Sequence, residues 1–224
     1  MDKRFLAILA AITIIFGGIF IVSQHSSNKS STGFNTVQPS NHLIGDGTKN
    51  VMLVEYGDYQ CPICEAYEPV MEQVRAAYTN IHFQFRNLPL SSLHPNAFSA
   101  ARAAEAASLQ NKFWEMHDSL YNQTNWQGWT VSSSPIDLFK VYAQQLGLDV
   151  TKFQFDFASE KVNSTIQADL NAFKATGQQQ ATPSFFLDGS HLDNPKLTDQ
   201  NNRPLFTKFQ VILDAEIVKQ QPKQ

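Results

Sequence analysis

The chain contains two cysteines, Cys61 and Cys64, which frame the tetrapeptide Cys-Pro-Ile-Cys. At this spacing two thiols face each other across one helical turn, close enough for a disulfide of low strain. If a helix begins here, Cys61 lies beside N–H groups without helical partners and beside the positive end of the helix dipole, which lowers its pKa below ~8.5. The pattern predicts Cys61 as the nucleophile and the deeper Cys64 as the resolving thiol.

Other roles for the pair remain open. A structural disulfide between residues this close closes a small loop and restricts the unfolded chain very little. A zinc site needs about four ligands, and the six histidines show no metal-ligand spacing, so no bound metal is expected. The two thiols alone could still carry copper or serve haem maturation. A reactive thiol pair is the preferred interpretation.

Further candidate site residues lie next to this pair or far from it in the chain. Pro62 suits a first helical turn, because the N–H that it lacks has no partner there, and Ile63 sits with it between the thiols, where substrate contact is expected. Glu55 stands in an apolar run. It is either a buried acid of raised pKa that exchanges a proton with Cys64, or a strand-end acid that reaches solvent or a lysine.

The surrounding pattern predicts a βαβ unit. Residues 51–56 form a nearly continuous apolar run, typical of a buried strand. Apolar residues then recur at helical spacing from Cys61 to near Asn80. Residues 81–86 alternate apolar and polar, as in a strand at or near a sheet edge. The two strands should be parallel, with a right-handed crossover.

Helical periodicity then dominates from about residue 95 to 177. Asp188-Gly189 favours a tight hairpin between two short strands, and a last helix follows Pro204. Thr182-Pro183 precedes the hairpin, and an isolated X-Pro bond is ordinarily trans. The order predicts an α/β domain, over residues 43–224, interrupted by a helical insertion.

The N-terminus bears on location. Residues 5–22 are apolar and uncharged after Lys3 and Arg4, and a helix of this length reaches about 27 Å, close to the ~30 Å of a bilayer core. We expect an uncleaved transmembrane anchor in residues 1–22, or else a cleaved signal, with a buried soluble helix least favoured. The charges place the rest of the chain outside the cytoplasm. The polar residues 23–42 suggest a flexible linker.

Composition excludes several classes of protein. The formal charge is −3 and no run of basic residues occurs, which argues against nucleic acid as the main partner. Two cysteines in 224 residues exclude a scaffold of several disulfides. Nucleotide-binding glycine motifs are missing, so no cofactor is expected.

Several sequence motifs, taken together and in their order along the chain, resemble those of DsbA-type proteins. They are VEYGDYQCPICEAYEPV, FRNLPL followed by HPNA, FWEMHDSLY, LGLD and ATPSFFLDG, and they cover the chain from about residue 43 onward. The resemblance implies a thioredoxin fold with a helical insertion, a redox pair formed by Cys61 and Cys64, and Glu55 as the acid beneath it. It also implies that Thr182-Pro183 is the cis-proline loop that contacts substrate backbone.

The resemblance implies a thiol:disulfide oxidoreductase that donates its disulfide to reduced, newly exported proteins and is reoxidised by a membrane thiol oxidase. The histidine found in the strongly oxidising member of this family is replaced by Ile63. We therefore expect a potential between about −120 mV for DsbA and about −270 mV for thioredoxin, still on the oxidising side. A reductase or isomerase, a non-catalytic thiol carrier and a peptide-binding module with an idle disulfide are the alternatives.

Overall fold

A five-stranded sheet forms the frame that positions the two cysteines. The computed structural model describes residues 37–221, and its strands lie in the order β1-β3-β2-β4-β5. β2 and β3 are parallel, as predicted, and the other neighbouring strands are antiparallel. The strands are β1 His42–Ile44, β2 Met52–Gly57, β3 His82–Asn87, β4 Ser184–Leu187 and β5 Ser190–Leu192.

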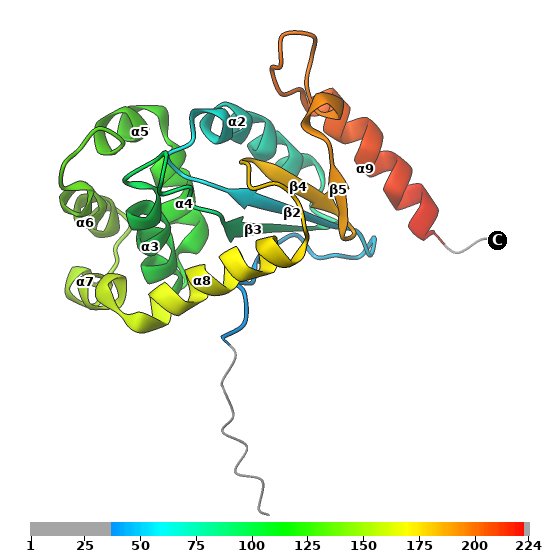
Figure 1. Ribbon diagram of the computed structural model, residues 1–224. Coiled ribbons are helices and arrows are strands. Elements are labelled where there is room, and N and C mark those ends of the chain that lie inside the picture. Colours follow the sequence, from blue (N-terminus) through cyan, green and yellow to red (C-terminus); the bar gives the residue numbers. More distant parts are fainter. Residues whose placement is uncertain (1–36, 222–224) are drawn as a thin grey trace, which may run out of the picture. The chain divides into compact units, whose positions relative to one another are not determined.

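Helices cover both faces of this sheet (Figure 1). α2, Pro62–Ala77, connects β2 to β3 and packs against α9, Phe206–Gln220. Alternate residues of a strand point to opposite faces, so Leu53 of β2 packs in the cluster with α2 and α9. Tyr56 packs on the other side with Phe173 of α8, Glu160–Ala175. The sheet core is therefore closed on both faces, as the apolar run in β2 predicted.

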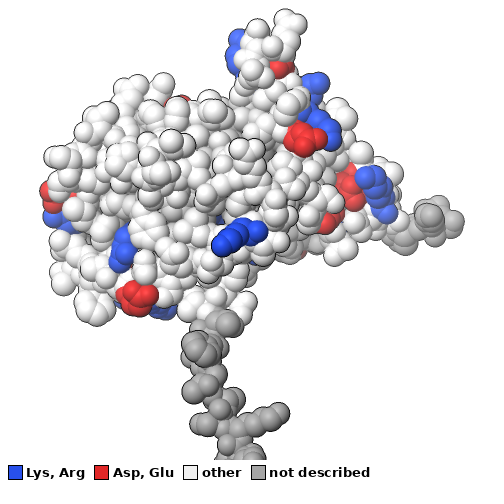
Figure 2. Space-filling model, in the orientation of Figure 1, with Lys and Arg blue, Asp and Glu red and all other residues white. Residues whose placement is uncertain are grey.

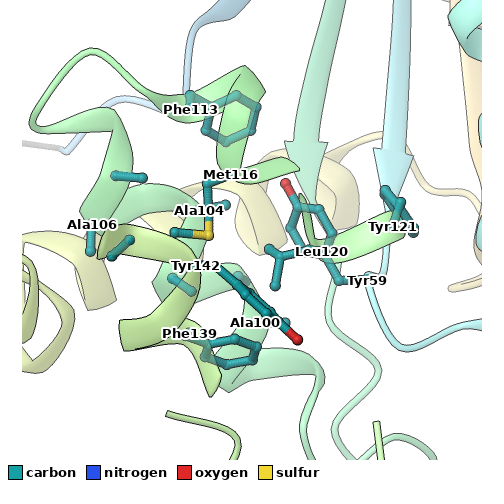
Figure 3. Close-up of a cluster of buried hydrophobic side chains, with 14 of the residues drawn as sticks. Tyr59, Ala100, Ala104, Ala106, Phe113, Met116, Leu120, Tyr121, Phe139 and Tyr142 are labelled. Atoms are coloured by element: carbon teal, nitrogen blue, oxygen red, sulfur yellow. The ribbon is translucent and has the colours of Figure 1, made fainter. Parts of the chain in front are cut away.

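The helical insertion lies between β3 and β4. Its central helix α3 packs against four of the others, α4, α6, α7 and α8. Seven of its residues are buried alanines, whose small side chains let neighbouring helices approach closely; Figure 3 shows some of them facing Phe113, Met116 and Phe139. The helices are α3 Ala97–Ser108, α4 Phe113–Tyr121, α5 Gln123–Trp129, α6 Pro135–Gln145, α7 Val150–Ala158 and α8 Glu160–Ala175.

The predicted hairpin is present. Asp188 and Gly189 join β4 to β5, both with positive φ, 47° and 80°. An Asp-Gly pair accommodates this backbone, which matches the twist of the flanking strands. The hairpin keeps the strand that follows Pro183 aligned along β2.

The folded region begins earlier than expected. Ser40 and His42 were assigned to the linker, yet the backbone N–H and the hydroxyl of Ser40 donate hydrogen bonds to Asp169 of α8, at 2.8 and 2.7 Å. His42 belongs to β1, and its Nε2 lies 2.8 Å from Oε1 of Glu105 in α3. The polar composition of this segment did not indicate that it is folded, because it is held by polar contacts and not by apolar packing.

The expected anchor or signal, residues 1–22, and most of the expected linker lie outside the described residues. Within residues 37–221, no helix has the length and apolarity needed to cross a membrane.

Candidate active site

Cys61 and Cys64 lie at the beginning of α2, just after the loop that follows β2. Cys61 is the N-cap residue and Pro62 the first residue of the helix, as predicted. Both cysteines are reduced in this structure and nearly buried, with 5% and 1% of their surface exposed. Cys64 is therefore slightly less exposed than Cys61.

The environment of Cys61 favours its thiolate. A hydrogen bond from the Cys64 thiol is the largest cause that lowers the pKa of Cys61, from 9.0 to about 6. Burial opposes this change, while hydrogen bonds from Thr182 and from the N–H groups of Cys64 and Ile63 add to it. The lowering has the predicted direction, but its main source is the partner thiol, and the helix N–H groups contribute less.

Cys64 is kept as a thiol by the opposite effects. Burial raises its pKa well above 9.0, and the hydrogen bond and charge of Cys61 raise it further. The negative charge of Glu55 acts in the same direction, which places that carboxyl group within electrostatic range of the sulfur. At neutral pH the reduced pair therefore holds one proton, on Cys64.

Glu55 is a buried acid. Only 1% of its surface is exposed, and its Oε2 has no hydrogen-bond partner among the described residues. Burial raises the pKa of Glu55 from 4.5 to about 8; the charge of Glu68 adds to this and Arg75 opposes it. The alternative that Glu55 reaches solvent is wrong, and no lysine pairs with it in the described part of the chain. A protonated carboxyl group near Cys64 can supply a proton to that sulfur.

A group of charged side chains acts on Glu55 and includes Arg75 and Glu68. Arg75 Nη2 lies 2.6 Å from Glu68 Oε1 and 3.4 Å from Asp118 Oδ1. Glu68, Asp118 and His117 form the one group of possible metal ligands in residues 37–221. The guanidinium of Arg75 lies between the two carboxylates and neutralises one of their two negative charges.

The loop before β4 faces Cys61. The Thr182-Pro183 peptide bond is cis, as the resemblance implied. Cys61 Sγ lies 3.5 Å from the carbonyl oxygen of Thr182, although the two residues are far apart in sequence. The backbone of Thr182 therefore lies directly beside the sulfur of Cys61.

Pro62 and Ile63 border a groove of about 520 Å³ beside the thiols. Ile63 is 55% exposed, and Pro62 and Ala66 are exposed as well, whereas Cys64 and Tyr67 on the same helix are buried. The other side of the groove is formed by the segment between β5 and α9. The lining residues are Pro62, Ile63, Ala66, Tyr67, Asn194, Pro195, Thr198, Asn202 and Pro204.

Comparison with known families agrees with this geometry. A family model described as thioredoxin matches residues 37–204, three quarters of the chain. The chain belongs to this thioredoxin family. Its thioredoxin fold with a helical insertion, expected from the sequence, is confirmed.

Solved structures of similar fold include several redox proteins. A thioredoxin-like oxidoreductase from Silicibacter pomeroyi DSS-3 has a TM-score of 0.64 at 21% identity, covering 84% of this chain and 99% of that one. The structure of Wolbachia pipientis alpha-DsbA1 has a TM-score of 0.63 at 19% identity, and the match covers 81% of this chain and 93% of that one. The structure of oxidised BdbD from Bacillus subtilis has a TM-score of 0.62 at 18% identity, and the match covers 82% of this chain and 97% of that one. The fold is thus that of DsbA-like proteins.

Curated relatives are larger proteins of which this chain matches a part. The chain is 36% identical over 154 residues to the Na(+)/H(+) antiporter NhaA 3 of Salinispora tropica, covering 69% of this chain and 22% of that protein. It is 32% identical over 204 residues to NhaA 1 of Mycolicibacterium vanbaalenii, covering 87% and 32%. Ion transport is an attribute of those longer proteins.

Two features of this thioredoxin-family site were not predicted from the sequence. One is Glu68, whose charge raises the pKa of Glu55; its position four residues after Cys64 on a helix was the available signal. The other is the wall of the groove that contains Pro195 and Pro204. No sequence pattern linked that segment to Cys61, because the link is a tertiary contact.

Proposed function

We propose that the chain is a thiol:disulfide oxidoreductase that donates the Cys61–Cys64 disulfide to reduced, exported proteins. The observation that carries this proposal is the opposite pKa perturbation of the two thiols. Hydrogen bonds lower the pKa of Cys61 to about 6, while burial raises the pKa of Cys64 well above 9.0. A pair of this kind releases one sulfur as a stable thiolate and retains the proton on the other.

The reaction begins with the oxidised pair. A substrate thiolate attacks Cys61, so that a mixed disulfide forms, the Cys61–Cys64 bond breaks and Cys64 departs with the electron pair. Cys64 then takes a proton from Glu55, which is mostly protonated at pH 7 and recovers its proton from solvent. A second substrate thiolate attacks the substrate sulfur and expels Cys61 as a thiolate. Two electrons pass from the substrate to the pair, and the substrate gains a disulfide.

The stability of the reduced pair supports the proposed direction of transfer. The Cys61 thiolate exists only when the disulfide is open, so everything that stabilises it favours electron uptake. The proposed location is the outer face of the cell membrane, or the periplasm, with residues 1–22 as anchor, and the alternative is secretion after signal cleavage. The proposed reoxidant is a membrane thiol oxidase.

The test of direction is the redox state of the pair in cells. Acid quenching followed by alkylation with a mass-tagged maleimide should show the pair oxidised at steady state, with the Cys61→Ser/Cys64→Ser variant as the unlabelled control. A predominantly reduced pair would instead favour a reductase or isomerase. Copper(I) retained at one ion per chain, with no oxidation of reduced peptides, would favour the thiol carrier. An unchanged cellular role for Cys61→Ser would favour the peptide-binding module.

A further inference from the structure

A second buried acid, which the proposed mechanism does not use, lies in the loop between β2 and α2. Asp58 is 1% exposed. Its Oδ1 accepts a hydrogen bond of 2.8 Å from the backbone N–H of Gln60, and its Oδ2 accepts one of 2.8 Å from the backbone N–H of Leu90. Nδ1 of His94 lies 2.7 Å from the same Oδ2 and is the third donor. A buried carboxylate with several donors is held in one position.

His94 belongs to the loop that leads from β3 into α3. Its backbone N–H donates to the carbonyl oxygen of Leu90 at 2.9 Å. Asn96, two residues further on, donates from its backbone N–H to Oε1 of Gln60 at 2.6 Å. The imidazole of His94 and the carboxamide of Gln60 therefore join the loop after β2 to the loop after β3. The carboxylate of Asp58 lies at the centre of this junction.

The backbone of Asp58 acts on both cysteines. Its carbonyl oxygen accepts a hydrogen bond of 3.0 Å from the N–H of Cys61. Burial raises the pKa of Cys64 well above 9.0, and a hydrogen bond from the backbone N–H of Asp58 to this sulfur acts in the opposite direction. Because the side chain of Asp58 is fixed, its backbone donor and acceptor are fixed beside the two thiols.

The charges that act close to the redox pair lie inside the protein. Figure 2 shows almost no charged side chains on the surface over α2 and α5, whereas Asp58 and Glu55 are both buried. Cys64 is only 1% exposed, so water contributes little to the stability of a negative charge on its sulfur. A fixed N–H group is most effective in such a place, because it needs no rearrangement when the charge develops.

We propose that His94 and Asp58 form a positioning pair that holds the Asp58 N–H where it stabilises the Cys64 thiolate as the disulfide opens. The proposal rests on the proposed function and adds two residues to its first step. In that step a thiolate attacks Cys61, the Cys61–Cys64 bond breaks, and the bonding electron pair remains on Cys64. The Asp58 N–H donates a hydrogen bond to this anion until the sulfur takes the proton of Glu55.

Reduction of the oxidised full-length chain by glutathione at pH 7, followed by stopped-flow fluorescence, tests the pair. His94→Leu removes the donor to Asp58 and should slow the opening of the disulfide by about tenfold. Loss of one fixed donor to a developing anion costs on the order of a hundredfold in rate, and here the N–H is loosened and not removed. His94→Asn should restore the rate to within about twofold, because the amide nitrogen of asparagine can take the place of Nδ1.

His82→Leu is the matched control. His82 begins β3 and pairs with Met52 at the start of β2, whereas Asp58 follows the other end of β2. The same substitution there removes an imidazole from the end of the sheet away from the cysteines. It should leave the rate of reduction unchanged.

Two readouts separate positioning from a general loss of structure. In single turnovers with a reduced dithiol peptide, His94→Leu should lower the maximal rate by about tenfold. The half-saturating peptide concentration should change by less than about twofold, because the pair does not contact the peptide. The midpoint of Cys61 alkylation should stay near pH 6, because the Cys64 thiol, which is the main cause of that pKa, is retained. A shifted midpoint would show a disturbed site and would contradict a positioning role.

NMR of the wild-type chain supplies a measurement that needs no substitution. The Asp58 amide proton should move downfield when the disulfide is reduced, because its acceptor sulfur gains electron density. An amide signal that ignores the redox state would overturn the proposal, as would equal rates for His94→Leu and the wild type. Equal slowing by His94→Leu and His94→Asn would also overturn it, since the donor would then be irrelevant. A wild-type chain that oxidises no dithiol peptide would refute the proposed function, while the glutathione rates would still decide the role of the pair.

Discussion

Replacement of Glu55 by glutamine tests whether the buried carboxyl group is protonated at neutral pH. Burial raises its pKa from 4.5 to about 8. The pKa of this group is near 4.5 in the unfolded chain and near 8 in the folded chain. The folded state therefore loses stability as the pH rises between these values. At pH 7 the loss is about 3 kcal/mol. Glutamine has nearly the same shape and no titrating proton, so Glu55→Gln escapes this loss.

Urea unfolding of the reduced wild type and of Glu55→Gln measures the effect. The variant should gain stability relative to the wild type by about 2 kcal/mol between pH 5 and pH 7. Both chains retain Cys61, whose own titration therefore cancels in the difference. A difference that does not change with pH would mean that Glu55 ionises at its ordinary pKa, which would refute the argument from burial.

The same variant tests the proton transfer. When the disulfide opens, Cys64 leaves as a thiolate whose pKa is far above 7, and it needs a proton. Without the carboxyl group of Glu55, reduction of the disulfide by glutathione at pH 7 should slow by on the order of a hundredfold. Stopped-flow tryptophan fluorescence can follow the reaction. An unchanged rate would show that the proton comes from another source.

The thiols, the Cys-Pro-Ile-Cys turn and the N-terminal contact give three more expected outcomes. The rate at which iodoacetamide modifies Cys61 should rise with pH with a midpoint near pH 6, and Cys64 should not react until the chain unfolds. A midpoint near pH 9 would show that Cys61 is not a thiolate at neutral pH. Ile63→His should raise the potential measured against glutathione by about 30 mV for each unit by which it lowers the pKa of Cys61; a fall would contradict the electrostatic argument. Asp169→Ala removes the acceptor of the hydrogen bonds from Ser40 and Asn87. The free energy of unfolding, measured in urea, should therefore fall by about 3 kcal/mol. An unaltered unfolding midpoint would show that these contacts are not stabilising.

The chemistry of the site could be predicted from the sequence because it is local. The spacing of Cys61 and Cys64 and the proline between them define a helix start, and a helix start places the second thiol deeper than the first. Glu55 could be identified as a candidate because an acid in an apolar run is unusual. Its burial could not be decided until the position of β2 in the middle of the sheet was known.

The contacts that surround this site could not be predicted, because they join distant residues. Asn96 and Gln60 are 36 positions apart and have no periodic relation. Ser40 reaches Asp169 across 129 positions, which is why a polar segment that resembled a linker is part of the fold. Helix α7, Val150–Ala158, lies within the predicted helical region, but its bounds could not be predicted, since nine residues give only a few turns of periodicity.

The asymmetry of the two thiols sets how strongly the pair can oxidise. The Cys64 thiol donates its hydrogen bond to the Cys61 thiolate, so the low pKa of one sulfur and the high pKa of the other have a common cause. This interaction exists only in the reduced chain and is lost when the disulfide forms. Lowering the Cys61 pKa from 9.0 to about 6 stabilises the reduced form by about 1.4 kcal/mol at pH 7, which corresponds to about 30 mV. That contribution is small compared with the ~150 mV between thioredoxin and DsbA, which is why we expect an intermediate potential.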